Sequence, residues 1–233
     1  MTSAYVSLGV IAAAVMVLWG YPETQADCSA KRGVSDLKIP QGLDLSTFNS
    51  MIVNNLMGEL YYAMNFETKY LPDVNYFSLI TRESDTVYRL ASVGDSVGTV
   101  PRCNTYSKYL YTETSTDTAE ARFRIGNSTT TDVYFSSCPT DYVWFMQCRK
   151  PYGPKLKKCA VGDTFLGLFI IQQNKSLIPG DREFLNNLPF DKMVRDVCPT
   201  GMKFGLPDLK WYFSFGKTVN CAGQDVFSKY IPK

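Results

Sequence analysis

Seven cysteines are the residues of this chain whose chemistry is the most readily anticipated: Cys28, Cys103, Cys138, Cys148, Cys159, Cys198 and Cys221. No two are spaced Cys-x-x-Cys and the chain has no histidine, so the ligand spacing typical of zinc fingers is absent and we expect no metal site. Cysteines in this pattern favour disulfides in an oxidising compartment. An odd number leaves one thiol unpaired, which allows a disulfide-linked dimer.

The lack of histidine also limits catalysis. It excludes Ser-His-Asp and Cys-His nucleophiles and a haem held by a proximal histidine. No spacing singles out a pair of carboxylates, and the glycines at positions 94 and 98 lack the lysine and following helix of a phosphate-binding loop. We therefore predict that the protein is not an enzyme and needs no cofactor. The catalytic alternative would have to use carboxylates, tyrosine or lysine.

The first 26 residues are typical of a signal peptide. An apolar run over residues 6–19 is followed by Gly20, Pro22 and a small-residue site ending at Ala26. The run is shorter than the roughly 20 residues of a membrane-spanning helix, although a retained anchor is the alternative. We expect cleavage to leave residues 27–233 as a single secreted domain.

Two further features bear on where the protein acts. The sequons at Asn127 and Asn174 agree with secretion and predict glycosylation. The chain has 24 Lys and Arg against 22 Asp and Glu, and this small, evenly spread charge excludes a nucleic-acid partner.

Several segments alternate apolar and polar residues with a period of two, which predicts β-strands with one packed face. The clear ones lie at 60–66, 121–125, 142–146 and 209–215, and weaker ones at 76–80, 86–93 and 108–113. Residues 164–172 are continuously apolar and fit either a strand or a buried helix. Helical spacing begins after Pro179, is interrupted at Pro189 and resumes at Asp191. Many strands, one helix and a last strand favour an antiparallel barrel or sandwich.

This order resembles the lipocalin family, an eight-stranded antiparallel up-and-down barrel followed by one C-terminal helix and a short ninth strand. The lead-in at 42–48, with Asp44 and Phe48, is similar to the family's, and Gly58-Glu59-Leu60-Tyr61 stands where lipocalins carry Gly-x-Trp-Tyr. Thr140-Asp141-Tyr142 resembles the family's Thr-Asp-Tyr motif, and the strand ending in Cys148 is most similar to the branch of insect bilin-binding proteins and apolipoprotein D. The chain departs from the pattern at Leu60, which replaces the tryptophan, and at Gln172-Gln173, where an arginine would stack on it.

The resemblance implies a carrier of a small hydrophobic ligand, such as a pigment, retinoid, fatty acid or sterol, held non-covalently in the barrel. A one-residue error in register would turn every side chain of a strand to the other face. The alternative is a secreted effector or inhibitor that binds a protein through the barrel loops, with Tyr106, Tyr109 and Tyr111 as contacts. The expected ligand-binding residues are Tyr62, Met64, Tyr88, Leu90, Phe123, Ile125, Tyr142, Trp144 and Met146.

The resemblance also implies a disulfide between Cys28 and Cys148. For the remaining cysteines we expect Cys103 with Cys221, joining the barrel to the C-terminal segment, and Cys138 with Cys159. This choice leaves Cys198 over, and other pairings stay open.

Overall fold

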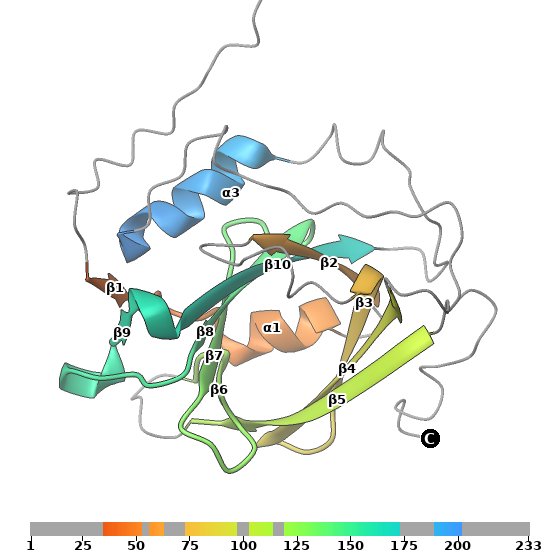
Figure 1. Ribbon diagram of the computed structural model, residues 1–233, viewed down its shortest axis with the longest axis horizontal. Coiled ribbons are helices and arrows are strands. Elements are labelled where there is room, and N and C mark those ends of the chain that lie inside the picture. Colours follow the sequence, from red (N-terminus) through yellow and green to blue (C-terminus); the bar gives the residue numbers. More distant parts are fainter. Residues whose placement is uncertain are drawn as a thin grey trace, which may run out of the picture.

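The computed structural model describes residues 35–52, 56–62, 73–96, 103–113, 119–172 and 189–201. Eight strands form one closed antiparallel barrel in the order β10-β2-β3-β4-β5-β6-β7-β8 (Figure 1). Apart from β10, which closes the barrel between β8 and β2, strands adjacent in the sequence are adjacent in space. The predicted eight-stranded up-and-down barrel is therefore confirmed. The strands are β2 (Leu56–Tyr62), β3 (Asp73–Arg82), β4 (Val87–Ser96), β5 (Cys103–Thr112), β6 (Arg122–Ile125), β7 (Thr131–Phe135), β8 (Tyr142–Cys148) and β10 (Thr164–Gln172).

The continuously apolar segment is a strand. In β10, Leu168 pairs with Leu60 of β2 on one side and with Trp144 of β8 on the other, which closes the ring. Alternate residues of this strand pack inside and outside the barrel, so both of its faces are apolar and the period of two is lost.

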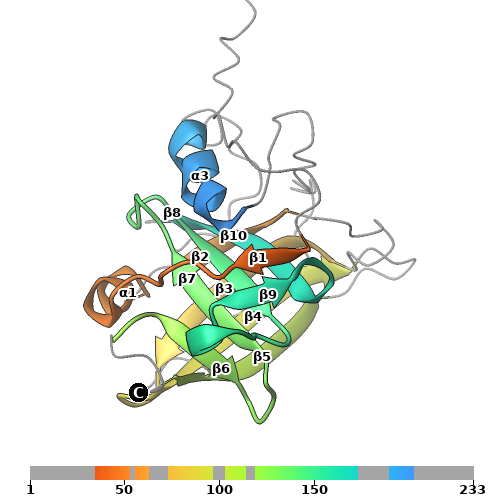
Figure 2. The ribbon, with the colours of Figure 1, turned by 90° about the vertical axis from the view of Figure 1, so that its left-hand side faces the viewer.

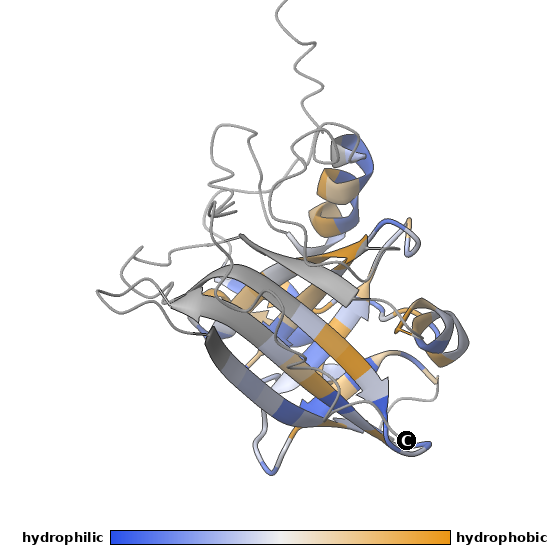
Figure 3. Cartoon of the chain, turned by 90° about the vertical axis from the view of Figure 1, so that its right-hand side faces the viewer, coloured by the Kyte–Doolittle hydropathy of each residue, from blue (hydrophilic) through white to orange (hydrophobic). Residues whose placement is uncertain are grey.

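The predicted helix after the barrel is confirmed as α3 (Phe190–Val197). Its apolar residues gather on one side of the helix and its polar residues on the other, as Figure 3 shows. Met193 and Val197 are buried, whereas Lys192 and Arg195 are exposed. The expected earlier helical turn at 179–188, the last strand at 209–215 and the signal peptide lie outside the described residues.

Three strands and one helix were not predicted. A two-stranded sheet of β1 (Asp36–Lys38) and β9 (Lys158–Ala160) crosses the outside of the barrel (Figure 2). The helix α1 (Leu45–Ile52) precedes the first barrel strand, and β7 contains no alternating pattern. Strands of three residues are too short to show a period, and β7 is buried along its whole length.

Asp44 begins α1. Its side chain accepts hydrogen bonds from the backbone N–H and the hydroxyl of Thr47, at 2.8 and 2.6 Å. These bonds to Thr47 hold the pKa of the Asp44 carboxyl below its usual value. The cap fixes the direction of the helix and buries Phe48, Met51 and Ile52.

The barrel wall separates two hydrophobic clusters. The inner cluster contains residues from α1 and from seven barrel strands, and the outer cluster lies between the barrel wall, α3 and the β1–β9 sheet. In the part of the chain that the structure describes, none of the helices is long and apolar enough to cross a membrane.

Candidate functional site: the interior of the barrel

An aromatic wall lines the interior. Phe48 enters from α1 and contacts the rings of Tyr88, Phe123 and Tyr134, with ring centroids 5.8, 5.2 and 5.1 Å away. Since these rings come from β4, β6 and β7, the helix fixes three separate strands against one side chain. Phe48 is completely buried, so α1 closes this end of the barrel.

Farther along the wall, the aromatic stack continues onto β8 and β10. The rings of Phe145 and Phe169 stack with their centroids 4.8 Å apart, and Phe165 approaches Phe145 at 5.5 Å. Smaller apolar side chains complete the inner cluster: Ile80, Leu90, Leu110, Val143 and Ile171.

A charged pair interrupts this apolar wall. Asp132 of β7 pairs in register with Phe123, and directly opposed residues of neighbouring strands share a face, so its carboxylate belongs to the interior. Lys108 of β5 lies opposite Leu90 on the same face, and its Nζ donates to Asp132 Oδ2 at 2.8 Å. Gln147 Nε2 donates to Oδ1 at 2.9 Å. The Asp132 side chain is fully buried, whereas that of Lys108 is 30% exposed.

A second polar contact joins β3 and β4. The hydroxyls of Ser78 and Ser92, which face each other across β3 and β4, are 2.7 Å apart and buried. One hydroxyl donates to the other. The interior thus combines a large apolar surface with two small polar groups.

Four of the predicted ligand-binding residues lie at this interior. Tyr88, Leu90 and Phe123 belong to the inner cluster, and Ile125 packs against it while half-buried. Their contact with a ligand stays a prediction. The Tyr88 hydroxyl donates to Asn49 Oδ1 at 2.8 Å, which ties β4 to α1.

Three predicted residues face the other way. Tyr142, Trp144 and Met146 belong to the outer cluster, so assigning them to the interior was wrong. The Tyr142 hydroxyl donates to Asp196 at 2.7 Å, and Trp144 Nε1 donates to the Met193 carbonyl at 3.0 Å. These groups hold α3 against the wall. Because β8 is buried on both faces, its apolar residues do not reveal which face points inward.

Two predictions fall outside the described side chains. Tyr62 pairs with Leu166 in the backbone register of β2 and β10, and neither its side chain nor Met64 is described.

Sequence reasoning missed the polar group and part of the aromatic wall. Asp132 stands between apolar and β-branched neighbours in Thr131-Asp132-Val133, and a carboxylate inside such a run was the available signal. Phe145 alternates with Trp144, so choosing one of the two residues for the interior excluded the other.

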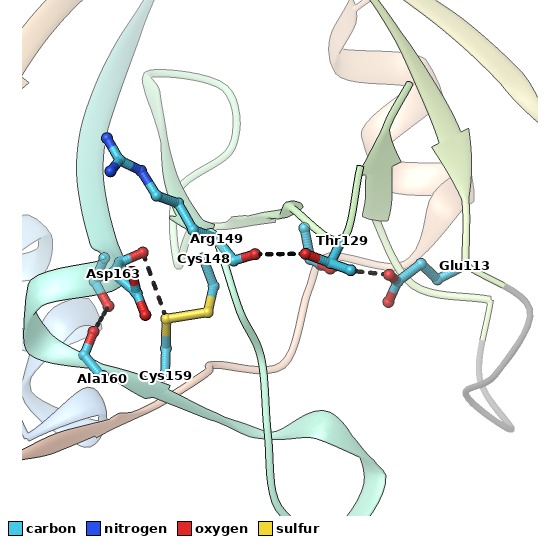
Figure 4. Close-up of a disulfide and its surroundings, with 9 residues drawn as sticks. Glu113, Thr129, Cys148, Arg149, Cys159, Ala160 and Asp163 are labelled. Atoms are coloured by element: carbon cyan, nitrogen blue, oxygen red, sulfur yellow. Dashed lines mark hydrogen bonds between the residues drawn. A yellow bond between two sulfur atoms is a disulfide. The ribbon is translucent and has the colours of Figure 1, made fainter. Parts of the chain in front are cut away.

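The disulfide predictions need correction. Cys148 is bonded to Cys159, with their Cα atoms 6.0 Å apart (Figure 4), which excludes both the Cys28–Cys148 and the Cys138–Cys159 pairs. Cys159 lies opposite Leu37 in the β1–β9 sheet outside the barrel, and the disulfide ties this sheet to Cys148 at the end of β8. Cys138 precedes the start of β8 and is a free thiol, whereas Cys198 is disulfide-bonded. The Cys103–Cys221 pair lies outside the described side chains.

Other predicted features can be located. Asn127 is exposed in the turn between β6 and β7, where a glycan has room, and Asn174 lies outside the described residues. Asp141 accepts hydrogen bonds from Thr140 and from the thiol of Cys138 in the turn before β8. Among the described residues, no group of three or more acidic or cysteine side chains is placed to hold a metal ion.

No family model matches the chain, and no curated protein matches it in sequence. Solved structures resemble it more distantly. The siderocalin Ex-FABP, which functions through dual ligand specificities, is 10% identical, with a TM-score of 0.37 over 60% of this chain and 78% of its own. Siderocalin Q83 is 10% identical, with a TM-score of 0.37 over 64% of this chain and 89% of its own. Lobster apocrustacyanin A1 is 11% identical, with a TM-score of 0.35 over 70% and 90%. The lipocalin family and its bilin-binding and apolipoprotein D branch therefore stay hypotheses drawn from the sequence.

Proposed function

We propose that this protein is a secreted carrier that holds a small, mainly apolar molecule non-covalently inside its barrel. The observation that carries the proposal is the composition of the interior, in which an aromatic and aliphatic wall surrounds the Lys108–Asp132–Gln147 group, whose carboxylate is buried. Sites for small molecules combine such a lining with a few polar groups that orient the ligand. Burial of apolar ligand surface supplies affinity at about 25 cal/mol per Å².

Lys108 is the group best suited to orient the ligand. Its ammonium has three N–H donors, of which one is donated to Asp132. Because the side chain is 30% exposed while its partner is buried, the ammonium can donate to an acceptor on a ligand without losing its carboxylate. We expect a ligand with one oxygen acceptor near an otherwise apolar body.

Binding rather than catalysis, without a permanent cofactor, is part of this proposal. The absence of histidine removes the commonest general base, and Asp132 is fully engaged by Lys108 and Gln147. The Cys148–Cys159 disulfide supports an oxidising destination.

Native mass spectrometry of the protein from its own source tests the proposal directly. We expect a retained small molecule, and displacement of a fluorescent fatty acid by the extracted compound. The variant Lys108→Met should weaken binding about ten- to a hundredfold, since a hydrogen bond to a charged group contributes roughly 1.5–3 kcal/mol. The exposed Lys192→Met on α3 is the matched control and should bind as the wild type does. A protein that carries no molecule and ignores the probe would contradict the carrier.

A second candidate is a protein-binding effector, which the exposed Tyr109 on the outer face of β5 favours. Tyr109 is 44% exposed and Arg89 stacks on its ring at 4.9 Å, whereas Tyr106, exposed to the same degree, lies opposite Ser92 on the inner face. Tyrosine and arginine are enriched in protein interfaces. An interior filled by its own side chains, together with loss of a purified target's binding in Tyr109→Ala, would favour this candidate.

A further inference from the structure

The segment that leads from β8 to β9 is strongly cationic. Residues 149–158 carry five basic and no acidic side chains: Arg149, Lys150, Lys155, Lys157 and Lys158. All five are exposed. Two apolar side chains stand among them, since Tyr152 and Leu156 are each 42% exposed, and they are half of the large hydrophobic residues that the described part of the chain exposes to this degree. Neither apolar side chain therefore serves mainly to fill the core of the protein.

The loop is held in one shape. The Cys148–Cys159 disulfide closes it, and Thr129 of the β6–β7 turn donates to the Arg149 carbonyl at 2.9 Å (Figure 4). Tyr152 and Lys158 exchange two backbone hydrogen bonds, at 2.9 and 3.1 Å.

The tip of this loop is strained. Lys155 and Leu156 have φ of 54° and 52°, the left-handed region that non-glycine residues rarely adopt. Strain of this kind costs on the order of 1–3 kcal/mol for each residue and persists at binding sites, where a fixed presentation of side chains is useful.

The surrounding charges add to the positive field. Lys38 of β1 lies directly opposite Lys158 of β9, an arrangement of like charges that weakens a sheet. Asp36 offsets part of this charge, because its carboxylate accepts from Lys158 Nζ at 3.0 Å. With Lys38 included, six basic side chains gather here, and the neighbouring acids are Asp36 and Asp163, whose backbone carbonyl accepts from the Arg149 N–H at 3.0 Å.

We propose that the loop of residues 149–158 docks the protein on a membrane surface that contains anionic lipids. Basic side chains contribute about 1 kcal/mol each beside such a surface, and tyrosine and leucine are favourable at the headgroup boundary. A sulfated polysaccharide would attract the lysines equally but would leave Tyr152 and Leu156 exposed. The combination of both kinds of side chain therefore favours lipid. This proposal does not depend on a ligand in the barrel.

Co-sedimentation of the full, oxidised protein with vesicles tests the proposal. We expect binding to phosphatidylcholine vesicles that contain phosphatidylserine, no binding to pure phosphatidylcholine, and weakening by salt. Lys155→Gln and Lys157→Gln should each lower the partition coefficient about fivefold, from roughly 1 kcal/mol per charge. The double variant Tyr152→Ser with Leu156→Ser leaves the charge unchanged and should also lower the partition coefficient. Lys192→Gln on α3 removes one exposed charge elsewhere and should change it little.

The result separates lipid from other anions. Equal binding to both vesicle types, or none to either, overturns the proposal. A protein that binds immobilised heparin but not the anionic vesicles also overturns the proposal, provided that Tyr152→Ser with Leu156→Ser leaves its heparin binding unchanged. Circular dichroism and the thermal midpoint of each variant show that the barrel is intact, which these exposed positions should preserve.

Discussion

The ring of Phe145 occupies the space where residue 167 would carry a side chain, which Gly167 leaves open. A Cβ built on Gly167 would lie 2.2 Å from two carbons of that ring, far inside van der Waals contact. The two residues pair directly across β8 and β10. The glycine therefore makes room for the stacked rings of the inner wall.

We predict that Gly167→Ala destabilises the protein by about 1–3 kcal/mol, the range for overpacking a core. Phe145 can move only by disturbing its stack on Phe169. Urea denaturation measures the loss. Gly162→Ala is the control, since nothing lies within 4 Å of its Cβ position, and it should be neutral or slightly stabilising. Equal stability of the two variants would show that the ring shifts without cost.

The Lys108–Asp132 pair should show strong coupling. Lys108→Met leaves the buried Asp132 carboxylate hydrogen-bonded to Gln147 without its cation. We expect the free energy of unfolding to fall by about 3 kcal/mol, at the low end for buried pairs because the lysine is partly exposed. The double variant Lys108→Met with Asp132→Leu should recover most of this loss. A double-mutant cycle by urea denaturation gives the coupling energy.

The exposed pair Arg82–Asp85, at 2.6 Å, provides the control for that cycle. Arg82→Met should cost less than about 1 kcal/mol, because solvent screens exposed charges. Additive single losses for Lys108 and Asp132 would show that the inner pair is no more coupled than the exposed one.

Stability at alkaline pH should depend on Tyr142. Burial, and then the hydrogen bond to Asp196, raise the pKa of its phenol above the usual 10.0. The unfolded phenol loses its proton first, so the neutral group stabilises the fold fully below about pH 10, and this contribution is lost as pH rises toward the raised pKa. Tyr142→Phe should lack this loss.

Urea midpoints of the wild type and Tyr142→Phe, measured over neutral to alkaline pH, separate this effect from the other tyrosines. At neutral pH the variant should be less stable by roughly 1 kcal/mol, since it loses the bond to Asp196. Tyr109→Phe, whose hydroxyl is exposed and accepts from Arg89, is the control. Parallel pH curves for wild type and Tyr142→Phe would refute the assignment.

The free thiol of Cys138 should react slowly. Its hydrogen bond to Asp141, at 3.1 Å, and its burial raise the pKa of the thiol, so less thiolate is present at neutral pH. We expect slow alkylation by iodoacetamide and faster alkylation in Asp141→Asn. Asp163→Asn, which changes an acid away from Cys138, should not alter the rate. A rate insensitive to Asp141 would show that access, not ionisation, controls the thiol.

The alternation of residues predicted most of the barrel because strands with one solvated face carry a readable period. Arg89 and Tyr109 point outward from β4 and β5 while Tyr88 and Leu110 point inward, and these strands were expected. The order of strands followed by a helix then gave the fold class. The β1–β9 sheet was missed because strand pairing across 122 positions in the sequence, from Leu37 to Cys159, leaves no local pattern.

The interior was predicted only in part, for a physical reason that β8 illustrates. Tyr142, Trp144 and Met146 suit a ligand pocket by their chemistry, but so do Val143 and Phe145. The position of α3 decides which set points inward, because Trp144 and Tyr142 donate hydrogen bonds to Met193 and Asp196 of that helix. Trp144 and Met193 are 49 positions apart in the sequence. The alternation of apolar and polar residues within one strand carries no information about a contact so distant.

Phe48 and the helix α1 close one end of the barrel. In the carrier proposed above, α1 closes the end of the barrel where β8 begins, so the ligand would leave at the end where β8 finishes, on the side of the Cys148–Cys159 loop. The rate at which the ligand exchanges would then depend on the residues at that end, while Phe48 would limit how deeply the ligand can enter. Shortening Phe48 to alanine would lengthen the longest chain accommodated without altering the path of escape.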